Sequence, residues 1–396
     1  MKIKLICAIL LLAVTLAACG KPSPAPSPEV TAPPTTATAV PSPSLAPTAE
    51  PSAEPSAEPN PVAELLRSMS LNEKIYQLFF VRPDALGDAG KTTAERLAAR
   101  PVGGFVCFRD NIDTAEQITA MLSDLQAFSA IPLFVGVDEE GGRVARVTGR
   151  SAVVPEKIPP MATIGKTGDA SQAFEVGAKL AGYIVELGFN VDFAPVADLL
   201  TNPKNNEIGD RSFGREPALV AEMVAREVAG LRQGGAAATL KHFPGCGSTE
   251  LDSHDGYSES LRTLEELCAE EFLPFKAGIE AGAEFVMVAH MSAVNVDASG
   301  LPSSLSRLMV TDLLRNELGF SGIIITDSMS MGAITERFAP EEAAVLALEA
   351  GVDMLLMPED LEAAARGVRE AVATGRLTES RLDESVTRIL RAKLGA

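Results

Sequence analysis

Eight short apolar runs recur along the chain, and amphipathic stretches separate them. The runs are QLFFV (77–81), GGFVCF (103–108), PLFVGVD (132–138), VDFAPVAD (191–198), ATLKHF (238–243), EFVMVAH (284–290), GIIITDS (322–328) and DMLLMP (353–358). Near-continuous apolar runs of this length are typical of parallel strands that are covered on both faces of a sheet. The stretches between them predict helices, most clearly over 115–129, 171–187, 218–233 and 264–281.

Eight strands alternating with helices in about 330 residues predict an α/β fold, a single (β/α)8 TIM-type barrel. A doubly wound open sheet is the alternative, because a strand count alone does not show that the sheet closes. No G-x-G-x-x-G follows the first strand, which disfavours that alternative. Residues 380–396 are expected to form a last helix rather than a further domain.

The first residues have the pattern of a secretion signal. Lys2 and Lys4 precede an apolar run over 5–16 that is too short to span a bilayer. The run ends in LAAC (16–19), which resembles a bacterial lipobox. By that resemblance residues 1–18 are a lipoprotein signal peptide and Cys19 is the lipidated mature N-terminus, which places the protein on the outer face of the cytoplasmic membrane. An ordinary cleaved signal peptide is the alternative.

Residues 19–60 are expected to tether the lipidated end to the barrel, which is predicted over 61–396. This linker consists almost entirely of Pro, Ala, Ser, Thr and Glu, so it has too little apolar surface to form a core. A Pro-rich tether of this length extends on the order of 100 Å. We therefore expect contact with the membrane through the lipid anchor only, and a monomeric enzyme.

Charge and cysteine content exclude several classes of protein. The net charge of −19 argues against a nucleic-acid partner and against polybasic attachment to anionic lipid. Beyond the signal and Cys19, the widely spaced Cys107, Cys246 and Cys268 form neither a disulfide framework nor a metal knuckle. We expect them to be buried or incidental thiols.

Polar residues gather at the ends of five of the predicted strands. In a barrel these ends open on one rim, where the catalytic residues of such enzymes lie. A single terminal aspartate is explained by helix capping, but five ionisable ends predict a pocket. The residues are Asp138, Asp198, Lys241 with His242, His290 and Asp327.

Six motifs, in order, resemble glycoside hydrolase family 3, and more narrowly its single-domain bacterial β-N-acetylglucosaminidases. The motifs are VDEEGGRVAR (137–146), VDFAPVAD (191–198), IGDRSFG (208–214), KHFPGCG (241–247), DSH (252–254) and ITDSMSMGAI (325–334). The resemblance covers the chain from about residue 62 onward. It implies a retaining glycosidase that removes terminal non-reducing N-acetylglucosamine from cell-wall-derived glycans or muropeptides.

The resemblance also implies the catalytic residues. Asp327, at a strand end, is the expected nucleophile and forms a covalent glycosyl-enzyme. His254 is the expected acid/base, paired with Asp252 two positions earlier. Imidazole suits this task because it titrates near neutral pH, and a neighbouring carboxylate fixes its tautomer.

Five further residues are expected to bind the sugar, and no metal or cofactor is expected. Asp138 accepts hydrogen bonds from vicinal hydroxyls, and Arg146 and Arg211 donate to sugar oxygens by resemblance. Lys241 and His242 are expected to bind sugar hydroxyls beside each other. His290 is expected to line the pocket without a role in proton transfer.

The chain departs from the family pattern at two places. Cys246 stands where the family usually has a second histidine, and DGYSES rather than a proline follows DSH (252–254). Since His254 is retained, we infer that the missing histidine is not the acid. The effect of Cys246 on loop packing or sugar contacts remains open at this level.

Other functions fit the sequence less well. A metal hydrolase lacks H-E-x-x-H and H-x-H motifs, and a serine acyl hydrolase lacks G-x-S-x-G. A lipid-tethered sugar-binding protein without turnover would not need both Asp327 and His254. A phosphorylase is a further alternative, because a histidine acid carries no negative charge that would repel phosphate.

Overall fold

The computed structural model describes residues 60–87, 92–249, 256 and 258–395. Cys19, the signal peptide and nearly all of the linker lie outside the described residues, so their assignments stay predictions. No helix in the described part combines the length and apolarity that crossing a membrane requires.

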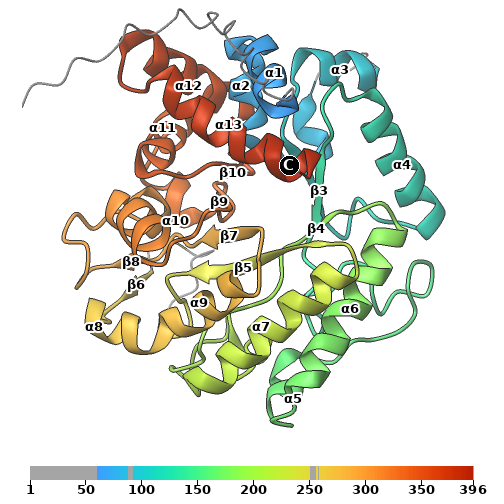
Figure 1. Cartoon of the computed structure of the whole chain (residues 1–396), viewed down its shortest axis with the longest axis vertical. Helices are drawn as coiled ribbons and strands as arrows, with labels where there is room; N and C mark the ends of the chain where they lie inside the picture. The colour runs from blue at the N-terminus through green and yellow to red at the C-terminus, as the bar shows by residue number, and fades with distance from the viewer. Residues whose placement is uncertain (1–59, 88–91, 250–255, 257, 396) are drawn as a thin grey trace, which may run out of the picture. The chain divides into compact units, whose positions relative to one another are not determined.

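All eight predicted strands form, and they make one parallel sheet in the order β10-β1-β2-β3-β4-β5-β7-β9. A parallel bridge between Ile325 and Met354 joins the two ends of this order, which makes the sheet a (β/α)8 TIM-type barrel (Figure 1). The strands are β1 (Phe79–Val81), β2 (Gly104–Cys107), β3 (Phe134–Val137), β4 (Val191–Asp192), β5 (Ala237–Phe243), β7 (Phe285–Val288), β9 (Ile323–Thr326) and β10 (Leu355–Leu356). A separate pair, β6 (Glu259–Ser260) with β8 (Ser292–Ala293), lies outside the barrel sheet.

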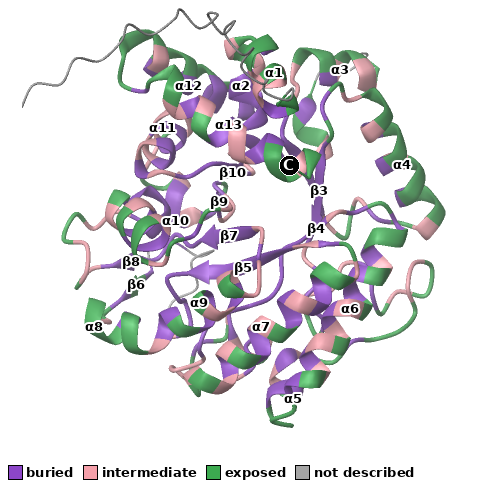
Figure 2. Cartoon of the chain, in the orientation of Figure 1, coloured by how far each residue is buried: buried purple, intermediate pink, exposed green. Residues whose placement is uncertain are grey.

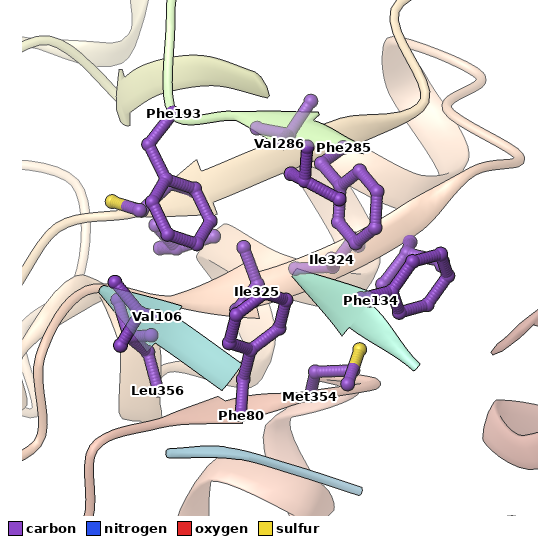
Figure 3. Packing of buried hydrophobic residues seen from close by; sticks show 14 of the residues in the cluster. Phe80, Val106, Phe134, Phe193, Phe285, Val286, Ile324, Ile325, Met354 and Leu356 are labelled. Atoms are coloured by element: carbon purple, nitrogen blue, oxygen red, sulfur yellow. The ribbon is translucent and has the colours of Figure 1, made fainter. Parts of the chain in front are cut away.

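The barrel is filled by aromatic and branched side chains from different strands (Figure 3). The ring of Phe80 lies 5.4 Å from that of Phe193, and Phe134 makes an edge contact with Phe285 at 5.1 Å. Glycine lets two rings approach at one point, since a Cβ on Gly136 would lie 2.9 Å from Phe80 and 3.0 Å from Phe193. The barrel interior is therefore a packed core, and its strand ends remain as the place for a site.

Helices surround the strands, with their buried sides on the barrel and their polar sides exposed (Figure 2). They are α1 (Pro61–Ser68), α2 (Leu71–Gln77), α3 (Thr93–Ala99), α4 (Ala115–Phe128), α5 (Met161–Gly165), α6 (Ala170–Glu186), α7 (Pro217–Gln233), α8 (Leu264–Glu266), α9 (Phe272–Glu280), α10 (Gly332–Thr335), α11 (Pro340–Ala350), α12 (Leu361–Thr374) and α13 (Glu379–Leu394). The π-helical segment Leu308–Glu317 precedes β9. Three of the four predicted helices are confirmed within a few residues, as is the last helix, α13.

The predicted helix over 264–281 is not one regular α-helix. A π-helical turn, Leu267–Glu271, separates α8 from α9. Pro274 near the start of α9 has no N–H to continue the ordinary helical hydrogen-bond ladder, which explains a change of winding just before it.

Two buried carboxyl groups lie in the layer between the barrel and its helices. Asp192 of β4 accepts a hydrogen bond from the backbone N of Glu139 through Oδ1 at 3.0 Å, while its Oδ2 has no partner among the described residues. Neither side-chain oxygen of Glu227, on α7, has a partner in that part of the chain. Burial raises the pKa of Asp192 well above its ordinary value and raises the pKa of Glu227 to about 8. The fold therefore holds Glu227 as a neutral acid below pH 8.

We expect the folded protein to lose stability between pH 5 and pH 8, and Glu227→Gln to reduce that loss. The pKa of Glu227 is higher folded than unfolded, so its contribution is fully present below the unfolded pKa of 4.5 and is lost as the pH rises through 8. Between these two pKa values, Glu227 alone lowers the free energy of unfolding by about 1.4 kcal/mol for each pH unit. Urea unfolding of both proteins at pH 5 and 8 measures it, and equal slopes in the two proteins would contradict a buried neutral Glu227.

Candidate active site

Four of the predicted site residues come together in one cavity at the carboxyl ends of the strands. Asp138 follows β3, Lys241 and His242 lie in β5, and Asp327 follows β9. All four line a cavity of about 490 Å³, and so do the predicted Arg146 and Arg211. The size suits one or two sugar rings. These predicted residues therefore lie together at one end of the barrel.

The cavity wall also has an apolar side. Phe108 follows β2 and Met357 follows β10, and both line the cavity together with Val106, Met287 and Leu356. Such side chains cover the apolar faces of a sugar ring, while polar groups bind its hydroxyls. Met357 has a φ of 48°, in the left-handed region that residues other than glycine rarely adopt. Its position is therefore set by its surroundings, and its backbone N donates to Phe80 at 2.8 Å.

Lys241 is the centre of a buried charge network. Its Nζ lies 2.7 Å from Asp138 Oδ1 and 2.6 Å from Glu140 Oε1. The guanidinium of Arg211 contacts both oxygens of Glu140 at 2.8 Å, an arrangement that fixes its plane. The side chains of Lys241 and Glu140 are each only 2% exposed. The network holds Asp138 and Arg211, which line the cavity, in fixed positions.

The network keeps its members charged. Burial alone would raise the pKa of Glu140, but the charges of Arg211 and Lys241 hold it well below its ordinary value. Burial likewise opposes the charge on Lys241, yet Asp138 and Glu140 raise its pKa. The carboxylate and the ammonium are therefore both ionised at neutral pH.

Glu140 is a site residue that the sequence prediction missed. It lines the cavity and bridges two residues that were predicted. The signal was present in VDEEGGRVAR, because residues 138 and 140 follow β3 directly and lie two positions apart, as do side chains on one side of an extended chain.

Glu139, between these two carboxylates, points away from the cavity and holds the segment that carries Arg146. Its Oε2 accepts hydrogen bonds from the backbone N of Arg146 and of Val147, both at 2.7 Å. Its Oε1 accepts from the backbone N and the hydroxyl of Thr148. The side chain of Arg146 then reaches Asp138, with Nη2 3.8 Å from Oδ2, and lies over the Phe108 ring.

Asp198 does not line the cavity but orients His242. Its Oδ2 contacts the Nδ1 of His242 at 2.7 Å, and its Oδ1 accepts from the backbone N of Cys246 at 2.6 Å. The Nε2 of His242 faces Arg211 Nη2 at 3.4 Å. Because a guanidinium only donates, Nε2 must accept and Nδ1 must carry the proton toward Asp198. His242 is thus held as a defined tautomer at the cavity wall.

One prediction about a neighbouring residue is corrected. His290 does not line the cavity, because it is 1% exposed and its ring contacts Ser304 Oγ at 2.7 Å and the Ser328 carbonyl at 2.9 Å. It instead supports the backbone next to Asp327. Cys246 is buried with its Sγ 4.0 Å from the His242 carbonyl, and burial raises its pKa well above the ordinary value. The expectation of a buried thiol at this position is confirmed, and Cys246 is not among the residues that line the cavity.

Asp327 is held in place by one hydrogen bond of its backbone and one of its side chain. Its backbone N donates to the Val288 carbonyl of β7 at 2.9 Å, which continues the barrel pairing. Its Oδ1 accepts from the backbone N of Ser328 at 2.7 Å. The side chain is half-buried and lines the cavity that Asp138 and Lys241 also line. This arrangement can present a carboxylate to a bound sugar from a rigid strand end.

Asp252 and His254, the predicted acid/base pair, lie outside the described residues. Among the residues that are described, no group of three or more His, Cys, Asp or Glu side chains is arranged to hold a metal ion. The described part of the site therefore consists of Asp327 and the charged wall of the cavity.

The comparisons with known proteins agree with this geometry. The sequence profile described as "Glycosyl hydrolase family 3 N terminal domain" matches residues 70–392. The chain is 33% identical over 295 residues to a protein of Nitrosomonas eutropha named beta-hexosaminidase, covering 72% of this chain and 83% of that protein. It is 32% identical over 326 residues to beta-hexosaminidase A of Pseudoalteromonas piscicida, covering 76% of this chain and 54% of that protein.

A solved structure is also similar. It is a glycoside hydrolase family 3 beta-N-acetylglucosaminidase from Paenibacillus sp. str. FPU-7, with a TM-score of 0.77 and 35% identity. The match covers 83% of this chain and 63% of that one. The chain thus spans between about half and most of the length of the proteins it resembles.

Proposed function

This chain belongs to glycosyl hydrolase family 3, and on that basis we propose that it removes terminal β-linked N-acetylglucosamine from the non-reducing end of glycans with retention of configuration. The observation that carries the proposal is that Asp327 lines the same cavity, of a size that suits a sugar, as the charged Lys241 and Arg211. The names of the relatives support the same sugar specificity. Cell-wall-derived glycans are the proposed source, since the first residues resemble a lipoprotein signal.

In the proposed mechanism Asp327 attacks C1 of the bound sugar. The C1–O bond to the aglycone breaks, the leaving oxygen takes a proton from His254, and a C1–O bond to the carboxylate forms. His254 then takes a proton from water, whose oxygen displaces Asp327 at C1 and restores the carboxylate. Asp252 is proposed to orient His254. Two inversions at C1 give net retention.

Described residues bind the sugar in this proposal. Asp138, Arg146, Arg211, Lys241 and His242, which line one cavity, take the hydroxyls of the sugar. Their mutual contacts fix these groups before the sugar arrives, so little ordering cost remains for binding. C1 becomes planar in the transition state. Hydrogen bonds from these residues to the sugar hydroxyls lower the barrier to cleavage if they strengthen at that point.

The test is release of chromophore from an aryl β-N-acetylglucosaminide, with the product followed by NMR. We expect the β-anomer of free N-acetylglucosamine as the first product, with and without phosphate in the buffer. Formation of a sugar 1-phosphate would show that the protein is a phosphorylase and not a hydrolase. Tight binding of the sugar without any product would identify a binding protein instead.

Replacement of His254 by alanine should slow cleavage according to the leaving group. We expect a loss of about 10²- to 10⁴-fold on a disaccharide, whose alkoxide needs a proton. A dinitrophenyl glycoside should react at nearly the wild-type rate of glycosylation, because its leaving group needs no proton. Pre-steady-state release of dinitrophenolate measures that step. An equal loss on both substrates would exclude His254 as the acid.

A further inference from the structure

A second cavity, of about 680 Å³, lies at the amino-terminal end of the barrel, opposite the cavity of Asp327. Phe134 and Ala237 line it and are the first residues of β3 and β5. Asn190 and Glu284 also line it and directly precede β4 and β7. The ends of α7 and α13 complete its wall. We refer to it as the amino-terminal cavity.

Lys393, in the last turn of α13, lines this cavity and directs its side-chain nitrogen into the interior. Figure 1 shows the end of α13 beside β3, the strand that begins with Phe134. The Nζ of Lys393 donates to Gln77 Oε1 at 2.8 Å and lies 5.1 Å from the centre of the Phe134 ring. Gln77 and Phe134 are only 1% and 5% exposed. The nitrogen is therefore enclosed, although the residue as a whole is half-buried.

Lys393 makes no ion pair with any residue that the structure describes. Lys74, on α2, is a contrasting buried lysine, because its Nζ contacts Glu379 at 2.7 Å and Asp383 at 2.8 Å, both on α13. Burial opposes the charge on Lys74, but these carboxylates raise its pKa. Burial acts alone on Lys393 and lowers its pKa to about 7. About half of Lys393 is therefore an uncharged amine at pH 7.

The other charges of the amino-terminal cavity are already matched. Within the described part of its wall, only Arg232 and Glu284 are charged besides Lys393. Arg232 Nε contacts Glu284 Oε1 at 2.7 Å, and Glu284 Oε2 accepts from the backbone N of Ala238 at 3.0 Å. Neither group is left to neutralise Lys393 or to pair with an anion bound to it. The wall therefore favours an uncharged group at the position of Nζ.

We propose that Lys393 is a site of acylation, at which its side-chain nitrogen attacks an activated acyl donor that enters the amino-terminal cavity. The nitrogen forms a bond to the acyl carbon, and the bond from that carbon to the leaving group breaks with its electron pair. The nitrogen gives up one proton to water or to the leaving group, and nothing is oxidised or reduced. The product is an uncharged amide. This modification is independent of the proposed glycosidase function.

Gln77 determines which product fits. Its Nε2 donates to the carbonyl of Pro101 at 2.7 Å, so its Oε1 must accept from Lys393. An amide keeps one N–H for this oxygen and needs no counter-ion. A neutral imine, formed from an aldehyde, has no N–H. A carbamate, formed from carbon dioxide, is an anion, and Arg232 is already paired with Glu284. Acyl donors are thus the class of reagent that the surroundings of Lys393 favour.

Competitive labelling of the full chain tests the proposal. A trace of para-nitrophenyl acetate acetylates the folded protein between pH 6 and 10, and deuterated acetic anhydride labels the remaining lysines after unfolding. Mass spectrometry of the peptides then gives the rate at each lysine. At pH 7 we expect Lys393 to react at least about tenfold faster than the exposed Lys157 and Lys166, whose uncharged fraction is about a thousandfold smaller. The rate at Lys393 should level off above about pH 8, whereas that of the exposed lysines gains about tenfold per pH unit.

Three controls separate the missing counter-ion from burial. Lys74, which is buried but paired, should react more slowly than the exposed lysines. Gln77→Glu places a carboxylate beside Lys393 with little change of shape, and should slow its acetylation at pH 7 at least about tenfold. Gln233→Glu adds the same charge to the cavity at a residue without a contact to Lys393 among the described ones, and should leave the rate within about twofold. Urea unfolding verifies that both variants fold.

The wild-type pH profile decides the proposal even where a variant fails to fold. A rate at Lys393 no higher than at the exposed lysines at pH 7, or one that keeps rising to pH 10, would overturn it. Unchanged reactivity of Lys393 in a folded Gln77→Glu protein would also contradict it. None of these results bears on the cleavage of glycosides, so the proposed function stands or falls separately.

Discussion

Alanine in place of Asp327 should abolish turnover of every β-N-acetylglucosaminide, with kcat lower by on the order of 10⁴- to 10⁶-fold. The change removes the carboxylate that lines the cavity at the end of β9, so no glycosyl-enzyme can form. The fold should survive, because the backbone N of residue 327 that bonds to the Val288 carbonyl is retained. Chromophore release and urea unfolding together separate a catalytic from a structural loss.

Azide provides the sharper test of the same prediction. Alanine leaves space beside C1, so added azide should restore cleavage of an aryl glycoside and yield the α-glycosyl azide, by a single inversion. The exposed Asp312, on the segment 308–317, gives a matched Asp→Ala control that should retain full activity. Substantial turnover by the Asp327 variant without azide, or a β-azide product, would exclude Asp327 as the nucleophile.

The strands of the barrel could be predicted from the sequence because each one is a short apolar run that is recognisable by itself. Runs such as GIIITDS (322–328) are apolar throughout, as strands buried on both faces must be, and each of the eight became a strand. Closure of the sheet between β9 and β10 is a non-local property, since Ile325 and Met354 pair across the intervening helices. No pattern within one run encodes that pairing. The π-helical turn before α9 also depends on one residue, Pro274, within an otherwise regular amphipathic pattern.

The site was predicted in part, for a related reason. Residues at strand ends, such as Asp138 and Lys241, are recognisable because parallel strands share one rim. Whether a residue faces the cavity or lies behind it depends on the neighbouring strands. His290 lies just beyond the end of β7, and its ring is enclosed by Ser304 and the Ser328 backbone instead of facing the cavity. Asp198 likewise does not line the cavity, and it affects the cavity only by orienting the ring of His242.

The burial of Glu140 is not evident from the residue types around it, although its spacing from Asp138 indicates the side it faces. From the sequence it is the second of two glutamates before a pair of glycines, a place typical of a solvated turn. In the structure its carboxylate is enclosed by Arg211 and Lys241, and its neighbour Glu139 is enclosed by backbone N–H groups. Of these two adjacent residues, Glu140 thus lines the cavity and Glu139 stabilises the segment behind its wall. Burial of a carboxylate requires partners that come from β5 and from the 208–214 segment.

Glutamine in place of Glu140 should destabilise the protein by about 3–5 kcal/mol and also raise KM for the sugar. The side chain keeps its shape but loses the charge that faces Lys241 Nζ at 2.6 Å and the fork of Arg211 at 2.8 Å. Two buried cations then lose the one carboxylate that contacts both of them, which costs far more than a lost surface pair. Urea unfolding and Michaelis–Menten kinetics measure the two effects.

A matched control lies on the surface. Glu216 pairs with Arg215 at 3.7 Å with 73% of its side chain exposed, so Glu216→Gln should cost at most about 1 kcal/mol. Adding Lys241→Met to the Glu140 variant removes one of the uncompensated cations, and should therefore recover part of the stability while activity stays low. If the Glu140 variant were as stable as the Glu216 variant, the buried network would not be holding the site. If the double variant regained activity, Lys241 would not be binding sugar, and the two measurements together decide between a structural and a binding role.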